Sequence, residues 1–318
     1  MLKSKKILFI APEFFSYSVL IQKELESMGA LVSLFSIRPT SLISKLTGLY
    51  LLHKYEKIKI KYFKKLLINF EKHYDYILII RADLLPDDFL PKLIALYPET
   101  KFIQYVWDDI DLIPNLSDSF KYFNRVLSYN IFDCEKHGLI FRPFFFVDQK
   151  SSDLKTVFRQ YEIFFIGSFR ADRLALLEKI LVKNPQIRFY YHLYINPITF
   201  FLNKISLRKR TLFKFHKMKY SEMIKMMNHS VAVLDMQNIF QNGLTTRIFE
   251  ALGARVKIVT TNRNILDYEF FNSNNILVID RNNPKIERNW LDTPYEEYDK
   301  VLLNKYHINS WISEVFDI

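Results

Sequence analysis

Glycine and cysteine are scarce in this chain of 318 residues, and long apolar runs are missing. The sequence has six glycines and one cysteine, Cys134, so it forms no internal disulfide and no cysteine-cluster metal site. A reducing, cytoplasmic compartment is the simplest expectation. No run approaches the roughly 18 apolar residues of a transmembrane helix, and the run 7–10 is too short for a signal-peptide core. We therefore expect a cytoplasmic protein, soluble or peripheral at the inner face of a membrane.

Charge and hydrophobicity limit the size of the core and the kinds of binding partner that the protein can have. Hydrophobic residues make up 49% of the chain, which suffices for the core of one large or two medium domains. The net charge of +11 would suit an anionic membrane surface or a nucleic acid. Lys, Ile, Asn, Phe and Tyr are abundant while Ala is scarce, so part of this charge reflects a composition bias typical of AT-rich genomes. No nucleic-acid-binding motif is present, and we expect no nucleic-acid partner.

Apolar runs with strand character alternate with helical patterns in two consecutive sets. The predicted strands are 6–10, 31–35, 76–80, 101–106, 125–128, 163–166, 187–193, 231–235, 256–260 and 275–279. The predicted helical stretches are 17–28, 40–74, 86–96, 171–182, 221–228 and 294–316. This alternation predicts an α/β fold of two doubly wound, Rossmann-like domains. A polar stretch at 148–160 is the predicted interdomain linker, which gives domains 1–150 and 151–293 and a C-terminal helical segment 294–318.

The stretch 241–253 (QNGLTTRIFEALG) carries the strongest functional signal. It lies between two predicted strands, so Gln241, Gly243 and Thr245 fall in a loop that leads into a helix. A helix N-terminus offers free backbone N–H groups to an anion. Arg247 suits a phosphate and Glu250 suits sugar hydroxyls. The alternative interpretation is a helix with a threonine N-cap and an exposed Arg–Glu pair.

These residues resemble the donor-site segment of bacterial GT-B glycosyltransferases. The closest resemblance is to the capsule and lipopolysaccharide biosynthesis group, akin to CgeB-like proteins, and it is local to residues 235–262. It implies a GT-B fold, in which an N-terminal acceptor-side domain and a C-terminal domain that binds the nucleotide sugar face a cleft. It also implies that Glu250 binds the ribose, that Arg247 lies near the diphosphate, and that the last helix returns to the N-terminal domain. Position 242 is Asn, so the common pair of Glu residues eight apart is absent.

A second candidate for the nucleotide sugar follows the predicted strand 163–166. Gly167 lets the backbone approach a ligand closely, and Arg170 and Arg173 could meet a diphosphate. In GT-B folds the corresponding loop lies at the interdomain cleft, which favours this interpretation. An ordinary strand–helix turn is the alternative.

Carboxylates after two strands of the N-terminal set are candidates for the acceptor side. Asp108 and Asp109 end the strand 101–106, and Glu13 lies just beyond the first strand. Such a carboxylate could act as general base on an acceptor hydroxyl, and a solvated turn is the alternative. Asp109 and Asp111 form an Asp-x-Asp pair, but two carboxylates are a weak metal signal and the seven histidines lack metal-ligand spacing. We expect no metal and no cofactor.

The sequence therefore predicts a glycosyltransferase that moves a sugar from a nucleotide-sugar donor to a hydroxyl of a surface glycan or a lipid-linked saccharide. Alternatives are a GT-B-like nucleotide-sugar epimerase or hydrolase, and a non-catalytic nucleotide-binding module. A Rossmann oxidoreductase is disfavoured, because residues 11–16 (APEFFS) stand where a Gly-x-Gly-x-x-Gly would follow the first strand. Basic residues alternate with apolar ones at 54–65 and 208–219, a pattern that suits an anionic membrane surface. A solvated helix face is the alternative there.

Overall fold

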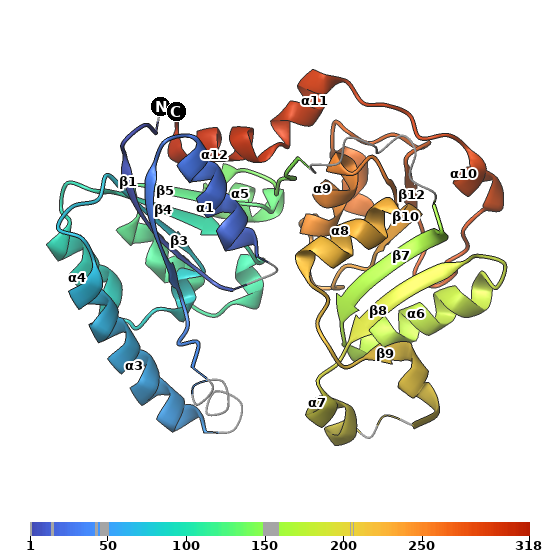
Figure 1. Ribbon diagram of the computed structural model, residues 1–318, viewed down its shortest axis with the longest axis horizontal. Helices are drawn as coiled ribbons and strands as arrows, with labels where there is room; N and C mark the ends of the chain where they lie inside the picture. The colour runs from blue at the N-terminus through green and yellow to red at the C-terminus, as the bar shows by residue number, and fades with distance from the viewer. Residues whose placement is uncertain are drawn as a thin grey trace. The chain divides into compact units, whose positions relative to one another are not determined.

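The computed structural model describes residues 2–13, 16–41, 44, 51–148, 159–203, 205 and 207–318. The chain forms two compact units: unit 1 consists of Met1–Pro143 and Ile308–Ile318, and unit 2 of Phe144–His307 (Figure 1). The sequence-based boundaries stand at 150 and 293. Part of the predicted helical stretch 40–74, and most of the predicted linker 148–160, lie outside the described residues.

Unit 1 is built on a parallel six-stranded sheet with the order β2-β1-β3-β4-β5-β6. Its strands are β1 (Lys6–Ala11), β2 (Leu31–Ser36), β3 (Tyr76–Ile80), β4 (Lys101–Val106), β5 (Arg125–Ser128) and β6 (Ile140–Phe141). The chain starts at β1, moves outward to β2, and then returns to the other side of β1 with β3. The strand order thus reverses between β1 and β3, and ligands of doubly wound sheets bind at the carboxyl ends of strands at such a point.

Helices cover this sheet, and one of them comes from the C-terminus. The described helices of unit 1 are α1 (Tyr17–Ser27), α3 (Leu52–Asn69), α4 (Phe89–Leu96), α5 (Ile131–His137) and α12 (Ile308–Phe316), with 3₁₀ turns at Ala82–Leu84, Ile110–Leu112 and Leu116–Tyr122. The indole of Trp311 in α12 is buried and lies edge-on to Tyr105 of β4, with 4.9 Å between ring centroids. Arg142 pairs with Glu314 at 2.9 Å. The last helix therefore completes the core of unit 1.

Unit 2 repeats the architecture with the strand order β12-β11-β10-β7-β8-β9, again all parallel. Its strands are β7 (Tyr161–Ser168), β8 (Phe189–Tyr194), β9 (Phe213–Lys214), β10 (Ser230–Asp235), β11 (Lys257–Thr260) and β12 (Ile276–Val278). Here the chain runs from β7 outward to β9 and then returns to β10 on the other side of β7. The reversal point of this sheet lies between β7 and β10.

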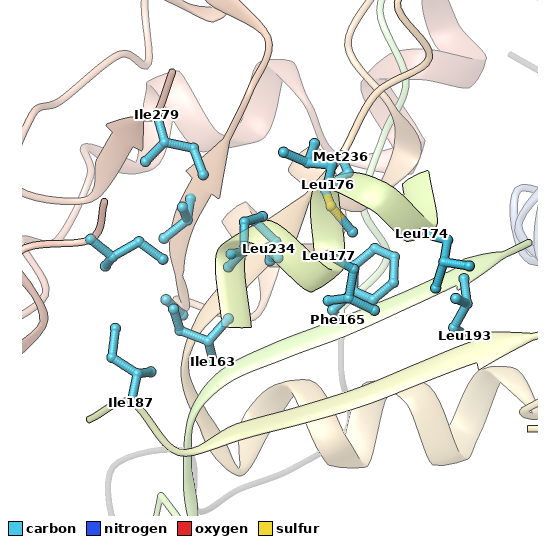
Figure 2. Close-up of a cluster of buried hydrophobic side chains, with 14 of the residues drawn as sticks. Ile163, Phe165, Leu174, Leu176, Leu177, Ile187, Leu193, Leu234, Met236 and Ile279 are labelled. Atoms are coloured by element: carbon cyan, nitrogen blue, oxygen red, sulfur yellow. The ribbon is translucent and has the colours of Figure 1, made fainter. Parts of the chain in front are cut away.

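The core of unit 2 is formed by apolar side chains of the sheet and of the helix that follows β7. The described helices are α6 (Ala171–Lys183), α7 (Pro197–Leu202), α8 (Tyr220–Asn228), α9 (Thr246–Gly253), α10 (Arg288–Asp292) and α11 (Lys300–Lys305), with 3₁₀ turns at Leu207–Leu212 and Arg263–Asp267. Figure 2 shows Phe165 of β7, Leu177 of α6 and Leu234 of β10 in this buried cluster. The cluster fixes the carboxyl ends of β7 and β10 relative to each other.

The predicted strands and the two doubly wound sheets are confirmed, with strand ends within two residues of the predicted ones. The prediction that Pro86 begins a helix is wrong, because α4 begins at Phe89 and Asp88 occupies its N-cap position. The edge strands β6 and β9 and the helices α5, α7 and α10 were not predicted, because two to seven residues are too few for a clear periodic pattern.

Candidate functional site

The predicted site residues of unit 2 follow β7 and β10, the two strands that flank the reversal point. Gly167 lies near the end of β7, and Arg173 lies in the first turn of α6. Gln241, Gly243 and Thr245 lie in the loop between β10 and α9. A hydrogen bond from Arg173 Nη2 to the carbonyl of Met236, at 3.2 Å, joins the two groups directly. The structure therefore brings these residues together at one edge of the sheet.

The loop 241–245 is held by side-chain amides from the segment after β11. Asn262 Nδ2 donates to the carbonyl oxygens of Asn242 and Gly243, both at 3.2 Å, and Asn264 Nδ2 donates to that of Asn242 at 2.9 Å. The carbonyl of Gln241 accepts a bond from Gln237 Nε2 at 3.3 Å. These bonds fix the path of the chain into the N-terminus of α9.

Asp235, the last residue of β10, also holds this loop through a side-chain hydrogen bond. Its buried carboxylate accepts hydrogen bonds from Thr245 Oγ1 at 2.7 Å and from Thr260 Oγ1 at 3.0 Å. Burial raises the pKa of Asp235, while the two hydroxyl bonds and the charges of Arg173 and Arg247 oppose that rise. Thr245 occupies the N-cap position of α9, but its side chain makes no capping bond there because the hydroxyl is directed to Asp235. The threonine cap of the alternative interpretation is thus not found.

Arg247 and Glu250 form an ion pair with each other on the face of α9 that packs on α8. Arg247 Nη1 bonds Glu250 Oε2 and also contacts the sulfur of Met223 in α8. The Glu250 side chain is 1% exposed, so the pair is buried and not exposed as the alternative interpretation had it. Burial, and the negative charge of Glu250, raise the pKa of the neighbouring Tyr220. Glu250 therefore stands in a low-dielectric environment and is charge-compensated.

Three guanidinium groups gather at the carboxyl edge of the sheet, and two of them pair with one carboxylate, that of Asp172. We call Arg170, Arg173 and Arg281 the arginine cluster. Arg170 bonds both oxygens of Asp172, at 3.0 and 2.6 Å, and Arg281 Nη2 lies 3.5 Å from the same carboxylate. Arg281 also donates to Thr261 Oγ1 at 3.2 Å and to the carbonyl of Gln237 at 3.3 Å.

The arginine cluster carries more positive than negative charge. Burial and repulsion by Arg170 lower the pKa of Arg173, and burial foremost lowers that of Arg281. Both groups stay protonated near neutral pH, because a guanidinium loses its proton only at far higher pH. Planar donors with surplus positive charge at a strand end are suited to a phosphate or diphosphate. A Cβ at position 167 would come within 2.9 Å of Cζ of Phe165 and within 3.3 Å of Cδ and Nη1 of Arg173, so Gly167 leaves room for both side chains.

Arg281 was not singled out in the sequence, although it follows the last strand closely. In unit 1, Arg81 was missed in the same way. It comes directly after β3 with φ 68°, an unusual conformation for a residue with a side chain. Its guanidinium bonds Asp83 at 2.8 and 2.9 Å and Asp108 at 2.5 Å. In both cases the position after a parallel strand was the available signal.

The three predicted carboxylates of unit 1 have separate environments. Asp108 is paired with Arg81. Asp109 is 3% exposed and accepts a hydrogen bond from Tyr129 Oη, and burial together with the charge of Asp109 raises the pKa of that tyrosine well above its usual range. Glu13 lies beyond β1 with an exposed side chain. The negative charges of Asp109 and Asp108 both raise the pKa of Tyr129, so these two carboxylates lie near the same hydroxyl.

Two further features bear on the class of site. Within the described part of the chain, no three His, Cys, Asp or Glu side chains are grouped so that they could hold a metal ion. None of the helices described is both long and apolar enough to cross a bilayer.

Solved structures of other proteins are similar to this chain over nearly its whole length. Sucrose-phosphate synthase from Thermosynechococcus elongatus matches with a TM-score of 0.62 and 9% identity, over 98% of both chains. AviGT4, a glycosyltransferase involved in avilamycin A biosynthesis, matches with a TM-score of 0.55 and 13% identity, over 99% of both chains. The UDP-N-acetylglucosamine 2-epimerase from Rickettsia bellii matches with a TM-score of 0.55 and 11% identity, over 98% of this chain and 96% of its own.

No protein-family model matches the chain, and a search of curated proteins gives no match. At 9 to 13% identity the similarities to solved structures concern the fold. Two parallel six-stranded units that match these enzymes over the full chain establish that the protein has the GT-B fold.

Proposed function

We propose that the protein is a glycosyltransferase that moves a sugar from a nucleotide diphosphate sugar to an acceptor hydroxyl. The observation that carries this proposal is the arginine cluster at the reversal point of the unit 2 sheet, beside the N-terminus of α9. In a transfer the acceptor oxygen bonds to the anomeric carbon and the bond from that carbon to the phosphate oxygen breaks. The leaving group is then a nucleoside diphosphate, whose new negative charge needs fixed positive groups.

Each donor-side residue has a proposed role. The guanidinium groups of Arg170, Arg173 and Arg281 would hold the diphosphate, and the N-terminal backbone N–H groups of α9 would bind its outer oxygens. Gly167, Gly243 and Gln241 would shape the backbone around it, with Thr245 holding the loop to Asp235. Glu250 would bind the ribose, which requires the side chains that cover its carboxylate to move. Arg247, paired with Glu250, would orient that carboxylate.

On the acceptor side, we propose Glu13 as the general base that takes the proton of the attacking hydroxyl. Its side chain is exposed, whereas Asp108 is paired with Arg81 and Asp109 is buried against Tyr129. A carboxylate without a strong ion pair is the better base near neutral pH. Asp108 and Asp109 would then fix the loop after β4 and position Arg81. No cofactor or metal is part of the proposal.

The acceptor that we propose is a surface glycan or a lipid-linked saccharide, in line with the resemblance of residues 235–262 to the capsule and lipopolysaccharide group. The protein would then work in the cytoplasm, at the inner face of the membrane. Nucleic acid is not a proposed partner. The basic surfaces of both units support an anionic membrane partner.

A nucleotide-sugar epimerase is the second candidate, because the fold is similar to that of the Rickettsia bellii epimerase over nearly the whole of both chains. A hydrolase or a non-catalytic module would use the same nucleotide site. A product that contains both sugar and acceptor separates the transferase from all three, because the epimerase and hydrolase need no acceptor and the module gives no product.

The test is calorimetric titration with UDP, GDP, dTDP and CMP of the wild type, Arg281→Gln and Arg188→Gln. Arg188 is the matched control, because it precedes β8 at the amino edge of the same sheet. We expect binding of one diphosphate in preference to CMP. Loss of a charge-assisted hydrogen bond should weaken it about tenfold or more in Arg281→Gln.

Arg188→Gln should bind like the wild type. If a folded wild type binds none of the four nucleotides, the donor site is wrong. If both variants bind as tightly as the wild type, the site exists but is not formed by the arginine cluster.

A further inference from the structure

The short helix α7 presents large apolar side chains to solvent on a firmly held support. Phe201 and Leu202 are 71% and 72% exposed, and Ile198 is also exposed. The adjacent Phe200 points inward and is buried against Phe213 and Phe215, with 5.5 Å between ring centroids in each case. Asn196 caps the helix by accepting the backbone N–H of Ile198 at 2.9 Å, and Pro197 occupies its first turn. The exposed residues are therefore placed by structure and are not a frayed end.

The sequence around α7 has no acidic residue at all. From 179 to 221 the chain contains neither Asp nor Glu, but it contains ten basic residues: Lys179, Lys183, Arg188, Lys204, Arg208, Lys209, Arg210, Lys214, Lys217 and Lys219. Lys209 is compensated by Glu178 from outside the stretch, at 2.7 Å. In the described part of the chain, Arg210, Lys214, Lys217 and Lys219 lie beyond ion-pairing distance of any carboxylate. Arg210 lies 6.0 Å from the ring of Phe215 and Lys217 5.7 Å from that of Tyr194.

This apolar and basic surface lies at the same edge of unit 2 as the arginine cluster. α7 follows the carboxyl end of β8, and β8 is the neighbour of β7 in the parallel sheet. The backbone N–H of Phe169, in the loop after β7, donates to the carbonyl of Tyr194 at 2.7 Å. Figure 1 shows α7 at the end of the unit, beyond β8 and beside β9.

We propose that α7 and the basic face from Arg210 to Lys219 dock unit 2 on an anionic phospholipid bilayer. Phe201, Leu202 and Ile198 enter the boundary between headgroups and acyl chains, and Arg210, Lys214, Lys217 and Lys219 lie over the lipid phosphates. The aliphatic side chains of Leu202 and Ile198 fit hydrocarbon better than they fit the bases of a nucleic acid. The basic helix α3 of unit 1 is the rival surface. Its side chains Phe63 and Leu66 are buried in the core, and its exposed Ile60 and Ile68 are eight positions apart, whereas α7 exposes three apolar side chains within five residues.

This docking surface rests on the proposed function at the inner face of a membrane. A bilayer at this edge would bring a lipid-linked acceptor to the side of unit 2 that carries the arginine cluster. Vesicle binding needs no substrate, so its failure is distinguishable from a failure of nucleotide binding.

The test is co-sedimentation with vesicles of phosphatidylcholine and phosphatidylglycerol (3:1), and with vesicles of phosphatidylcholine alone. We expect binding to the anionic vesicles that weakens with added salt, and much weaker binding to the neutral ones. The double variant F201S/L202S should lower the partition constant on the order of 100-fold, because two apolar side chains lose their burial. The triple variant K214Q/K217Q/K219Q should lower it by a similar factor.

Two control variants make the result specific. V182S alters a residue that is 76% exposed near the end of α6, at the opposite edge of the sheet, and should bind like the wild type. K54Q/K57Q/K61Q removes the same number of charges from α3 and should retain most of the binding. Loss of binding in this triple variant with retention in F201S/L202S would overturn the assignment. Absence of vesicle binding by the wild type, or binding to RNA in place of vesicles, would overturn the proposal itself.

Discussion

Gly253→Ala is a substitution for which helix propensity and packing predict opposite signs. Gly253 is the last residue of α9, where alanine would be the better helix former by about 0.5–1 kcal/mol. A Cβ at this position, however, would come within 2.5 Å of Cγ and Cδ2 of Phe146 and 2.7 Å of its Cβ. Ordinary contacts between carbon atoms begin about 1 Å further out. Gly253, one of the two glycines of the stretch 241–253, is therefore explained by packing and not by a ligand.

The size of the effect follows from how little Phe146 can move. Rotation of its ring leaves the overlap with its Cβ in place. Its backbone is held by the bond from Phe146 N to the carbonyl of Tyr306 at 2.9 Å, and its ring lies edge-on to His307, with 5.5 Å between ring centroids. Overpacking of this kind costs about 1–3 kcal/mol. After the propensity gain we expect a net loss of about 1–2 kcal/mol, or a fall in Tm of roughly 2–8 °C for a unit of this size.

The assay is thermal unfolding followed by circular dichroism, for the wild type, Gly253→Ala, Phe146→Ala and the double variant. Phe146→Ala removes the ring, so Gly253→Ala in that background should be neutral or slightly stabilising. The difference between the two backgrounds isolates the contact. A Gly253→Ala protein with a Tm equal to or above that of the wild type would refute the packing argument. Equal effects in both backgrounds would assign the loss to some other cause.

Buried groups give three further predictions. Because burial raises the pKa of Asp235, its neutral form stabilises the fold, and this contribution is lost as the pH rises from about 4 through the raised pKa. In urea titrations Asp235→Asn should therefore gain stability relative to the wild type between about pH 4.5 and 8. A stability difference that stays constant over this range would contradict the prediction. Glu250→Ala leaves Arg247 without its ion-pair partner and should lower the free energy of unfolding by about 3–5 kcal/mol. The double variant Arg247→Met/Glu250→Ala should recover part of this loss. Equal stability of the two variants would show that the unpaired arginine is not the cause. Burial raises the pKa of Cys134 to about 12. At pH 8, iodoacetamide should therefore alkylate this thiol roughly a thousandfold more slowly in the native protein than in the protein unfolded in urea. Equal rates would show that the thiol is accessible.

The sequence was sufficient for the sheets because their strands are apolar runs of four to eight residues bounded by polar ones. Residues 76–80 and 101–106 were predicted as strands for this reason, and β3 and β4 have the same bounds. The partners of the site residues were not predictable, because they depend on contacts between distant positions. Thr245 bonds Asp235 and not the N-terminus of α9, and Arg173 reaches the carbonyl of Met236 across the reversal point.

The arginine cluster also depends on contacts between distant positions that the sequence alone does not indicate. A run such as 168–173 (SFRADR) offers arginines after a strand, but nothing in it indicates that a third comes from a position more than a hundred residues later. Arg281 joins Asp172 only because β12 and β7 are strands of one parallel sheet, whose carboxyl ends share an edge. The doubly wound architecture was predicted but the strand order was not, and the position of Arg281 follows from that order. Arg81 is the first residue after β3, whereas Arg281 is the third residue after β12. The first position after each predicted strand would therefore have indicated Arg81 but not Arg281.

Positive charge has three different uses in unit 2, and the net charge of the chain distinguishes none of them. Lys257 is buried, donates to the carbonyl of Trp290 and to Thr293 Oγ1, both at 2.6 Å, and serves the fold. Arg173 and Arg281 are partly buried at a strand edge with too little negative charge around them, which suits a small anion. Lys217 is exposed and lies over the ring of Tyr194, the last residue of β8, which suits an extended anionic surface. A composition bias toward lysine and arginine would scatter such residues over the surface, but it would not remove every carboxylate from 43 consecutive residues around an exposed apolar helix. Burial and the number of nearby carboxylates therefore separate the structural cations from those proposed to bind a nucleotide and those proposed to bind a membrane, and each group can be removed in a separate variant.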